Sequence, residues 1–466
     1  MLYASRKIDM LHGPIFRSLV LVALPLIATN LLQLLFNTAD VVIIGRYGNG
    51  SNALAAVGVA GMVVGTFVSF ITNFSVGATY VAGKAIGARD STCLRHAIHA
   101  AMGFAAAGGM AMMLLMAATM RPLLLLLRTP ETVFDDAMRY LWFCLPSIPA
   151  CAIYNFGAAL LRARGDTQRP FCILTFSGIV NVLLNLFFVL RLKMDVAGVA
   201  LATTIAFYLS AGAMLWLLCH EEDDWHLDWR RLALHPDTLR PMVFTGLTAA
   251  VQAMFFHAAN LVVQGAVNSF GSSAIAGNTA SANIGSYLWT SMQGFAQTSM
   301  SFSAQNTGAR NYRRVWQICW RAMFAAFAVG LFQGLLCVAF GRELLGIYTN
   351  DPDAIQAGLH RLHFICGFYA FCGVMDTLAY TIRGMGYSLL PTITSTIGAL
   401  GIRLAWIFTL FQIPRFHSLF WLYMTYPVSW TATIAAHAVA LAVILKLKIR
   451  RSENRQGAAA KGTLPN

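Results

Sequence analysis

The sequence of 466 residues is poor in charged residues, and poorest in acidic ones. Asp, Glu, Lys and Arg make up 11% of it, whereas hydrophobic residues make up 58%. A soluble globular domain carries about 25% charged residues, so this composition excludes that class and indicates a protein of the lipid bilayer. The net charge of +14 lies mostly between the hydrophobic segments, where it marks membrane topology, and no nucleic-acid partner is expected.

Motifs of catalysis and of nucleotide binding are also lacking. No P-loop, G-x-G-x-x-G, H-E-x-x-H or nucleophile elbow occurs in a usable context, so neither an enzyme nor a cofactor is expected. The nine cysteines include no C-x-x-C pair, which supports neither a disulfide framework nor a zinc site. Without a nucleotide site, any uphill transport must draw on an ion gradient.

Long hydrophobic segments, by contrast, are abundant. A helix needs about 20 apolar residues to cross a hydrocarbon core about 30 Å thick. The predicted fold class is therefore an all-α integral membrane protein with twelve transmembrane helices. They are expected near residues 16–45, 53–82, 93–120, 132–160, 170–190, 196–219, 240–268, 274–302, 315–340, 354–382, 388–412 and 417–445.

The second half of the chain repeats the first at a spacing of 221 residues. Gly87–Arg89 (GAR) recurs as Gly308–Arg310, and Leu161–Pro170 (LRARGDTQRP) recurs as Ile382–Pro391 (IRGMGYSLLP). A spacing kept along the chain indicates duplication of one six-helix unit. Because six crossings return the chain to its starting side, the two lobes are expected in the same orientation, related by a pseudo-two-fold axis along the membrane normal.

The predicted domains follow from this repeat. An N-lobe with helices 1 to 6 spans residues 1–219, a cytoplasmic linker spans 220–239, and a C-lobe with helices 7 to 12 spans 240–449. The carboxylates of the linker are expected to form a solvated face. Residues 450–466 are charged and rich in small residues, and we expect them to be disordered. Most Lys and Arg lie on the side of both termini, which predicts that both are cytoplasmic.

Two acidic residues, Asp40 and Asp376, lie well inside hydrophobic segments. A carboxylate in hydrocarbon costs from about 3 to more than about 10 kcal/mol, so such a residue usually faces a polar cavity and marks an ion path. Gln33 and Asn37 precede Asp40 at helical spacing, which places the three on one face. We expect this face to line the interior, with Gln33 and Asn37 in the substrate cavity. The alternative for Asp40 is a structural role near the outer end of its helix.

Other polar residues of the first half could complete an ion site. Asn181 and Asn185 lie one turn apart on the fifth predicted helix. Thr203 and Thr204 lie in the sixth predicted helix, and Asn155 lies near the end of the fourth. Such residues either hold membrane helices together or bind ions, and only convergence on the buried carboxylate would favour ion binding.

The second half differs from the first at the corresponding position. Asp376 can pair with Arg383 or with Arg403, or it can take part in ion coupling. His257 can titrate near neutral pH or form an interhelical contact. The repeat places Asn260 where the first copy has Asp40, so ion coupling is expected in the N-lobe.

The set of motifs resembles the multidrug and toxic compound extrusion (MATE) transporters over about residues 12–448. The sequence Asn37-Thr38-Ala39-Asp40 ends helix 1, Gly-Ala-Arg follows helices 2 and 8, and an (L/I)-R-x-x-G motif follows helices 4 and 10. This resemblance implies a secondary antiporter of organic, cationic or amphiphilic drug-like compounds. The coupling ion would be H⁺ or Na⁺, without another cofactor. It also implies a monomer in the bacterial inner membrane.

The damage-inducible-type branch of that family implies a coupling-ion site in the N-lobe. Carried over, its residues are Asp40, Asn181, Asn185, Thr203 or Thr204, Asn155 and Tyr140. The sequence departs at Asn185, where that pattern has Asp, so the site would hold one carboxylate. Another branch has a helix 7 Glu and a helix 10 Asp in the C-lobe. Here helix 7 has no carboxylate, and Asp376 lies one turn nearer the cytoplasm.

The implied mechanism is alternating access. Neutralisation of Asp40 would let helix 1 repack, with a bend at Pro25, although a proline also bends membrane helices for structural reasons alone. One alternative is a lipid-linked oligosaccharide flippase of the same superfamily. That activity would favour several cavity-facing arginines, whereas only Arg403 is expected to lie deep. A remote alternative is an integral-membrane enzyme.

Overall fold

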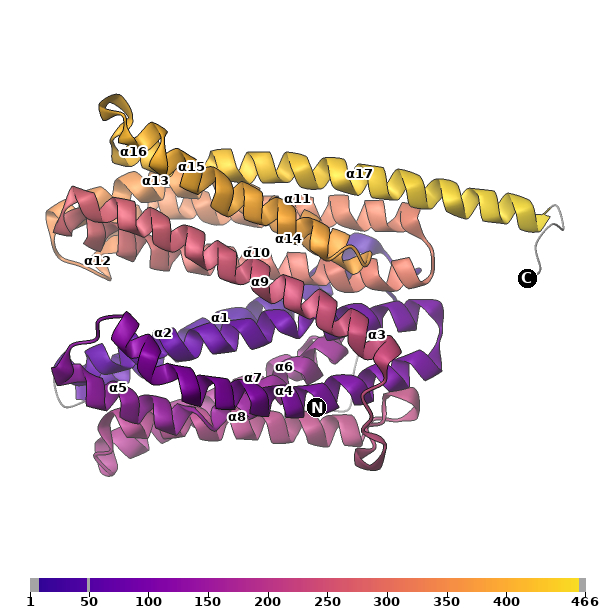
Figure 1. The fold of residues 1–466 in the computed structure, drawn as a ribbon, viewed down its shortest axis with the longest axis horizontal. Helices are drawn as coiled ribbons and strands as arrows, with labels where there is room; N and C mark the ends of the chain where they lie inside the picture. The colour runs from indigo at the N-terminus through magenta and orange to yellow at the C-terminus, as the bar shows by residue number, and fades with distance from the viewer. Residues whose placement is uncertain (1–7, 48–50, 461–466) are drawn as a thin grey trace. The chain divides into compact units, whose positions relative to one another are not determined.

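The computed structural model describes residues 8–47 and 51–460, and every regular element in these two ranges is a helix (Figure 1). The all-α fold is thus confirmed. Two helices continue through a π-helical stretch: α7 through Phe187–Arg191, and α14 through Thr396–Gly401 into α15. The α-helices are α1 (Ile15–Tyr47), α2 (Ser51–Phe74), α3 (Val76–Ala88), α4 (Ser91–Leu126), α5 (Glu131–Cys144), α6 (Ser147–Arg164), α7 (Gln168–Leu186), α8 (Asp195–Cys219), α9 (Pro236–Val267), α10 (Ser272–Gly308), α11 (Tyr312–Ala339), α12 (Gly341–Gly346), α13 (Pro352–Gly384), α14 (Leu389–Ser395), α15 (Ile402–Phe408), α16 (Leu419–Tyr423) and α17 (Thr425–Ala460).

The membrane spans agree in number with the expectation. Ten helical stretches in the described ranges are long and apolar enough to cross a bilayer. The pair α5 and α6 forms an eleventh span, bent by 49° at a break that contains Pro146. Helix α10 is long enough, at 37 residues, but it is rich in Ser, Thr, Gly and Asn and is not among the ten. With α10 the spans reach the predicted twelve.

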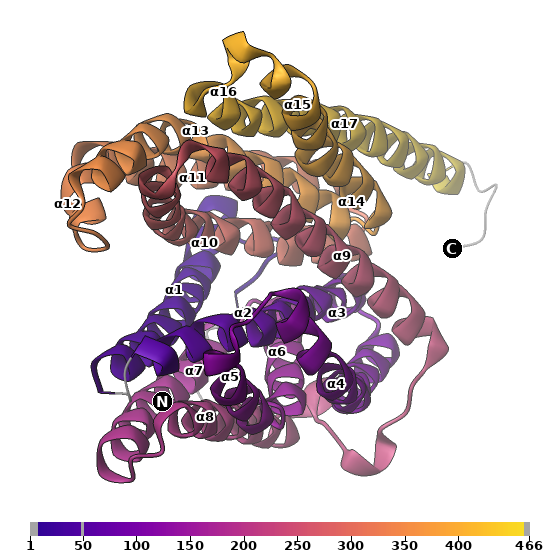
Figure 2. The ribbon, with the colours of Figure 1, turned by 60° about the vertical axis from the view of Figure 1, so that its left-hand side comes forward.

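The chain forms two compact units by its contacts, and each is described by itself. The first unit comprises residues 28–86 and 90–250 of the described chain. In it α4 packs on α6, α6 and α7 pack on α8, and α2 packs on α5 (Figure 2). All helices with candidate ion-site residues of the first half, including the second part of α1, belong to this unit.

The second unit comprises residues 8–27, 87–89 and the described chain from Val251 onward. Its centre is α10, which packs on α11 and α13, while α13 also packs on α17. A core of aromatic and aliphatic side chains includes Val263, Tyr423, Tyr426 and Trp430. Apolar burial of this kind stabilises contacts among helices that already lie in lipid mainly through close packing.

The contacts divide helices α1 and α9 between the two units. Residues Ile8–Ile27 belong to the second unit, and residues up to Ala250 belong to the first. The compact units therefore do not coincide with the lobes 1–219 and 240–449, which stay a prediction based on the repeat. The linker between them contains two short 3₁₀ turns, Asp223–Trp225 and Trp229–Arg231.

Glycines at repeat-related positions make the same helix contact in both units. A Cβ atom at Gly109 of α4 would lie 2.8 Å from the Cα of Pro149, and one at Gly330 of α11 would lie 3.0 Å from the Cα of Ala370. Gly330 follows Gly109 by 221 residues, and Ala370 follows Pro149 by the same number. Only glycine permits such close approach of two helices. The sequence repeat thus corresponds to a repeated packing geometry.

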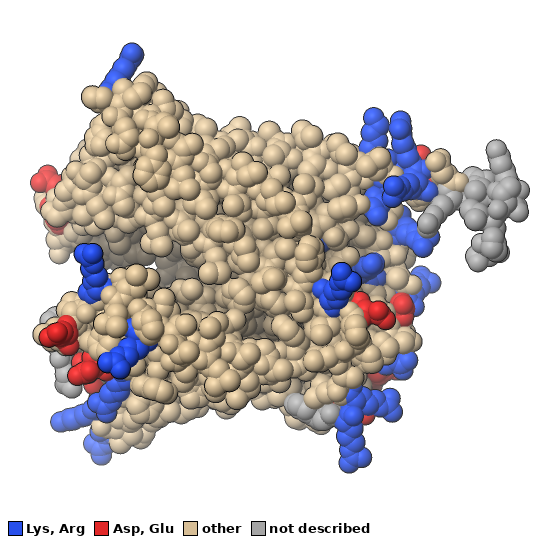
Figure 3. All heavy atoms as spheres, viewed as in Figure 1, with Lys and Arg blue, Asp and Glu red and all other residues tan. Residues whose placement is uncertain are grey.

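Charged residues gather toward the helix ends, and a wide band of uncharged residues lies between them on the face that Figure 3 shows. This distribution fits helices that cross a bilayer. One expectation for the tail is corrected: residues 450–460 continue α17, whereas we expected disorder from 450. Alanines 458–460 favour a helix that is already nucleated upstream, so the helix extends. Residues 461–466 lie outside the described residues.

Candidate functional site

Asp40 lies in the last third of α1 and is buried, with 7% of its surface exposed. The polar residues on the same face are more accessible: Gln33 is half-buried and Asn37 is exposed. The role of Gln33 and Asn37 in a substrate cavity stays a prediction. The buried carboxylate is the group that needs a partner, because burial of a charge without one is costly.

Two helices supply hydrogen-bond donors to this carboxylate. Asn185 of α7 donates its Nδ2 to Asp40 Oδ1 at 2.5 Å, and Thr203 of α8 donates its hydroxyl to Oδ2 at 3.3 Å. Asn181 lies one turn before Asn185. With its amide turned so that the nitrogen faces Asp40, it donates to Oδ1 at 3.1 Å. The convergence that the sequence could not establish therefore exists for these residues.

The site combines one carboxylate with neutral side chains. Among the described residues, no Lys, Arg or His lies within ion-pair distance of Asp40. The Oδ1 of Asn185 is buried and has no hydrogen-bond partner in the described chain. An Asn amide can present either its N–H or its oxygen after a half-turn. The same side chains can thus donate to an ionised Asp40, or offer oxygens to a proton or a small cation beside it.

The remaining residues of the predicted set do not bond to Asp40 in the described chain. Thr204 donates to the carbonyl of Phe143 at 2.7 Å, so Thr203 is the threonine that faces Asp40. Asn155 donates to the carbonyl of Cys151 at 2.9 Å within its own helix. Tyr140 of α5 is buried and lies close enough to Asp40 for an electrostatic interaction between them. The described contacts thus leave Thr204 and Asn155 out of direct contact with the carboxylate.

Pro25 lies inside α1 without ending it. The contacts of α1 change from the second to the first unit between Ile27 and Ala28, two residues further on. A proline removes one backbone hydrogen bond and so lowers the cost of a bend there. The hinge role of Pro25 stays a prediction.

The second buried carboxylate has neutral partners as well. Asp376 of α13 accepts hydrogen bonds at Oδ2 from Trp289 Nε1 at 3.0 Å and from Gln293 Nε2 at 2.6 Å. Of the alternatives for Asp376, a direct ion pair with Arg383 or Arg403 is not formed, because neither lies within ion-pair distance in the described chain. Sequence reasoning missed Trp289 and Gln293. Their spacing of four on one helix was the available signal.

Arg383 and Arg403 bond to amides instead. Arg383 donates to Gln252 Oε1 at 2.7 Å, and Arg403 donates to Asn260 Oδ1 at 2.8 Å. Arg403 also lies over the ring of Tyr426 at 4.3 Å. The expectation that Arg403 alone lies deep is wrong, because Arg361 and Arg383 are buried too.

His257 of α9 is exposed at its surface and is not part of the Asp376 cluster that the structure shows. The sequence alone could not decide between a titrating His257 and one that forms an interhelical contact, because a histidine on an apolar helix is compatible with both. A coupling role for His257 stays a prediction without a structural partner in the described chain.

Comparison with known proteins identifies the family of this chain. A family model described as MatE matches residues 25–187 and 248–409, which is more than half of the chain. The chain belongs to the MATE family. Members of this family are membrane transporters of small organic molecules that use ion gradients, and they are not enzymes.

The relatives of this MATE transporter include several bacterial proteins. It is 26% identical to the probable multidrug resistance protein YpnP of Bacillus subtilis, over 82% of this chain and 85% of that protein. It is 24% identical to an FAD transporter of Shewanella oneidensis, over 74% and 77% of the two chains. A structure described as the outward-facing conformation of a multidrug resistance MATE family transporter of the MOP superfamily has the same fold. It has a TM-score of 0.87 at 18% identity and covers 96% of this chain and 99% of that chain.

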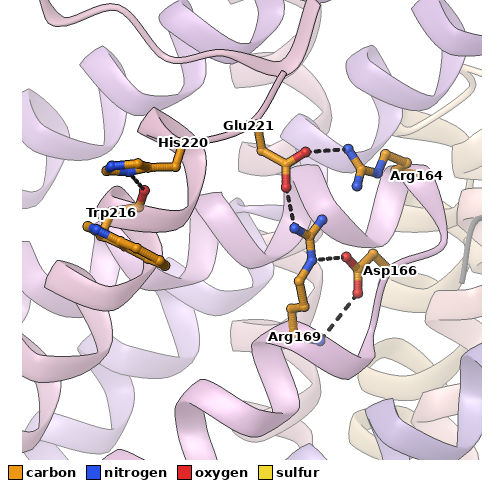
Figure 4. A network of polar contacts seen from close by, with 6 residues as sticks. All are labelled: Arg164, Asp166, Arg169, Trp216, His220 and Glu221. Atoms are coloured by element: carbon orange, nitrogen blue, oxygen red, sulfur yellow. Dashed lines mark hydrogen bonds and ion pairs between the residues drawn. The ribbon is translucent and has the colours of Figure 1, made fainter. Parts of the chain in front are cut away.

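In the first unit of this MATE transporter, an ion-pair network joins the end of α6, the first turn of α7 and the segment after α8 (Figure 4). Glu221 accepts from Arg164 at 2.8 Å and from Arg169, and Arg169 also pairs with Asp166. Burial opposes ionisation of Glu221, but its bonds to Arg164 and Arg169 outweigh burial and lower its pKa. The expectation of a solvated carboxylate face is therefore wrong for Glu221, because two guanidinium groups draw it into the protein.

Proposed function

We propose that this protein is a secondary antiporter that exports organic, cationic or amphiphilic compounds in exchange for H⁺ or Na⁺. The observation that carries the proposal is Asp40, a buried carboxylate in a membrane-spanning helix with only neutral hydrogen-bond partners. A carboxylate with a permanent cationic partner stays ionised, whereas Asp40 can bind and release a proton or a small cation. The occupancy of this site by the ion can therefore differ between the two sides of the membrane when an ion gradient is present.

Alternating access would follow from the two charge states of Asp40. When Asp40 is ionised, Asn181, Asn185 and Thr203 donate to it and hold α1 against α7 and α8. A proton or Na⁺ at the carboxylate removes the need for these donors, since their oxygens can turn toward the new positive charge. The relative stability of two positions of α1 then changes, and Pro25 is where the helix would bend.

The substrate class rests on chemistry and on the relatives. The single carboxylate of the proposed ion site, Asp40, favours organic cations, which would compete with the coupling ion for it. Several relatives carry names of multidrug resistance proteins, which supports a range of substrates rather than one. The protein is proposed to act as a monomer in the inner membrane with both termini in the cytoplasm.

The test uses protein reconstituted in liposomes loaded with ethidium, a fluorescent organic cation. Gradients of pH and of Na⁺ are imposed separately, so the arm that drives ethidium movement identifies the coupling ion. The isosteric variant Asp40→Asn keeps the shape of the site but cannot change charge. We expect gradient-driven transport to fall by at least about tenfold, equivalent to about 1.4 kcal/mol of lost coupling.

Asp376→Asn is the matched control, because it removes the other buried carboxylate that lies inside a membrane-spanning helix by the same change. We expect it to reduce transport less than Asp40→Asn does. Near-normal transport by Asp40→Asn would refute the proposal. A larger loss from Asp376→Asn would place coupling in the second unit.

A further inference from the structure

A cavity of about 400 Å³ opens where helices α3 and α10 end. All of its lining residues belong to the second compact unit, and two of them are arginines at repeat-related positions. A volume in this range suits a small ligand. The lining residues are Leu11, His12, Gly87, Ala88, Arg89, Gly308, Ala309, Arg310 and Asn311.

The two Gly-Ala-Arg motifs build the walls of this cavity in the same way. Arg89 and Arg310 follow a helix end with left-handed backbones, at φ values of 54° and 57°. In each copy the next N–H returns to the helix: Asp90 bonds to the carbonyl of Ala85 at 3.0 Å, and Asn311 bonds to that of Asn306 at 2.8 Å. Glycine is the usual residue at such a position, since a side chain costs about 1–2 kcal/mol there. Both copies nevertheless place an arginine there.

Gly87, at the start of the first motif, lies directly against the residues that precede the second motif. A Cβ atom at Gly87 would overlap the backbone carbonyl of Gln305, so no larger residue fits without displacement of α10. This contact sets the separation of the two motifs. It holds Arg89 and Arg310 at the rim of one cavity.

The N-terminal segment forms a further wall and is fixed in place. Arg314 donates to the carbonyls of Met10 and Gly13, and Asn306 donates to the carbonyl of Met10 at 3.1 Å. These bonds hold Leu11 and His12 at the cavity. The cavity is thus lined by segments with defined backbone partners.

The cavity carries uncompensated positive charge. In the described chain the guanidinium groups of Arg89 and Arg310 have no ion-pair or hydrogen-bond partner, and no carboxylate is among the lining residues. The nearest acidic residues in sequence are engaged: Asp9 accepts from the N–H of Leu11 and pairs with His12 at 3.4 Å, and Asp90 accepts from the N–H of Cys93. The guanidinium groups therefore remain available for an anion.

We propose that this cavity binds a phosphate group carried by an anionic ligand. Arginine forks match the oxygens of a phosphate, and the two guanidiniums face one ligand from both copies of the motif. His12 and Asn311 can add hydrogen bonds to the same group. Arg89 directly follows a stretch that is apolar enough to span a membrane, and Arg310 follows the end of α10, so an anionic lipid headgroup can supply the phosphate. The phosphate can thus come from an anionic lipid or from a soluble metabolite.

The test is calorimetric titration of the full-length protein in an uncharged detergent. Dihexanoylphosphatidylglycerol is the lipid probe, glycerol 3-phosphate is the soluble probe, and dihexanoylphosphatidylcholine controls for the acyl chains. We expect Arg89→Gln/Arg310→Gln to weaken binding of the phosphate probes by roughly tenfold or more, since each charge-assisted bond is lost. Arg89→Lys/Arg310→Lys, which keeps the charge without the fork, should bind with intermediate affinity.

The matched control is Arg128→Gln/Lys193→Gln. It removes the same charge from two exposed residues that share the left-handed backbone, with φ of 52° each, but lie outside the cavity. We expect wild-type affinity from it. Tighter binding of the lipid than of glycerol 3-phosphate assigns a lipid source, and equal binding assigns a soluble one.

Three results would overturn the proposal: no binding of either phosphate probe to the wild type, unchanged binding by the double Gln variant, or an equal loss in the control. If the double Gln variant does not fold, the single variants Arg89→Gln and Arg310→Gln replace it, and each should weaken binding. Binding is measured without a gradient, so the outcome is independent of the proposed coupling at Asp40.

Discussion

On α7, the helix that carries Asn185, Gly178 leaves room for a side chain of α1, the helix that carries Asp40. A Cβ atom at Gly178 of α7 would overlap the ring of Phe36 on α1. The hydrogen bond of 2.5 Å from Asn185 to Asp40 lies two turns further along α7. A small residue at position 178 is therefore a condition for the site, although it touches neither polar side chain.

We predict that Gly178→Val separates α1 from α7. Added volume in a packed contact costs about 1–3 kcal/mol, so the melting temperature in detergent should fall, and transport should fall with it. The control is Gly212→Val on α8, where a Cβ atom would meet nothing within 4 Å. Equal effects of the two variants would show that the close approach at Gly178 is not required.

Sequence spacing predicted part of this site. Asn181 and Asn185 share a helix face, and Asp40 closes a polar stripe, so these three could be proposed from periodicity together with family resemblance. The choice between Thr203 and Thr204 could not be made, because adjacent residues differ by about 100° around a helix. The rotation of α8 that decides it comes from packing, which no local pattern reports.

At the scale of the helix, Glu221 ties three elements together. Arg164 ends α6, Arg169 lies in the first turn of α7, and Glu221 follows α8. Breaking such a half-buried cluster leaves two guanidiniums short of an acceptor. The cluster has no counterpart at the related positions of the second half, where Met385 and Leu390 replace the two arginines.

We predict that Glu221→Gln lowers stability by on the order of 1–3 kcal/mol at pH 7. The pKa of Glu221 is lowered in the folded state, so its contribution is complete well above 4.5 and is lost as pH falls below that ordinary value. The melting temperatures of the two proteins should therefore approach each other as the pH falls from 4.5 through the lower folded-state pKa of Glu221. Glu222→Gln, at the exposed neighbour, should change little at any pH; a constant difference between wild type and Glu221→Gln would contradict the assignment.

Element boundaries followed from hydropathy except where backbone chemistry intervened. The fourth predicted span, 132–160, is two helices, because Pro146 lacks the N–H that would continue the first. The helical extension of α17 to Ala460 was missed because charged composition suggested disorder. Local composition does not show that a helix already formed upstream can be extended without a new nucleation step.

Across the whole molecule, the duplicated scaffold carries different charges in its two halves. Asn260 occupies the position related to Asp40, and Arg403 donates to it. Arg361, Arg383 and Arg403 are buried in the second unit, whereas Asp376 is a buried carboxylate there. Repeat analysis predicted the common fold, but it could not predict these pairings, since the residue type differs between the copies at several of the positions that make them, such as Arg403 and Asp376.

We predict that Asn260→Asp does not create a second coupling site. The new carboxylate would accept from Arg403 and remain ionised beside that fixed cation. Reversal potentials measured in liposomes should give the same number of ions per substrate as the wild type. The variant Asp40→Asn/Asn260→Asp should stay uncoupled. A larger ion count, or recovery of coupling in the double variant, would mean that Arg403 does not neutralise the site.

Helix α10 has a consequence for how the chain enters the membrane. Two of its polar side chains bond to helices that come later in the chain: Ser291 accepts from Gln333 of α11, and Gln293 donates to Asp376 of α13. Neither partner has been synthesised when α10 leaves the ribosome, and its own apolar content is too low for ready partition into lipid. We therefore expect the nascent α10 segment to remain at the translocon until α11 has been synthesised. Membrane insertion of the second half is thus expected to proceed by helix pairs rather than one helix at a time.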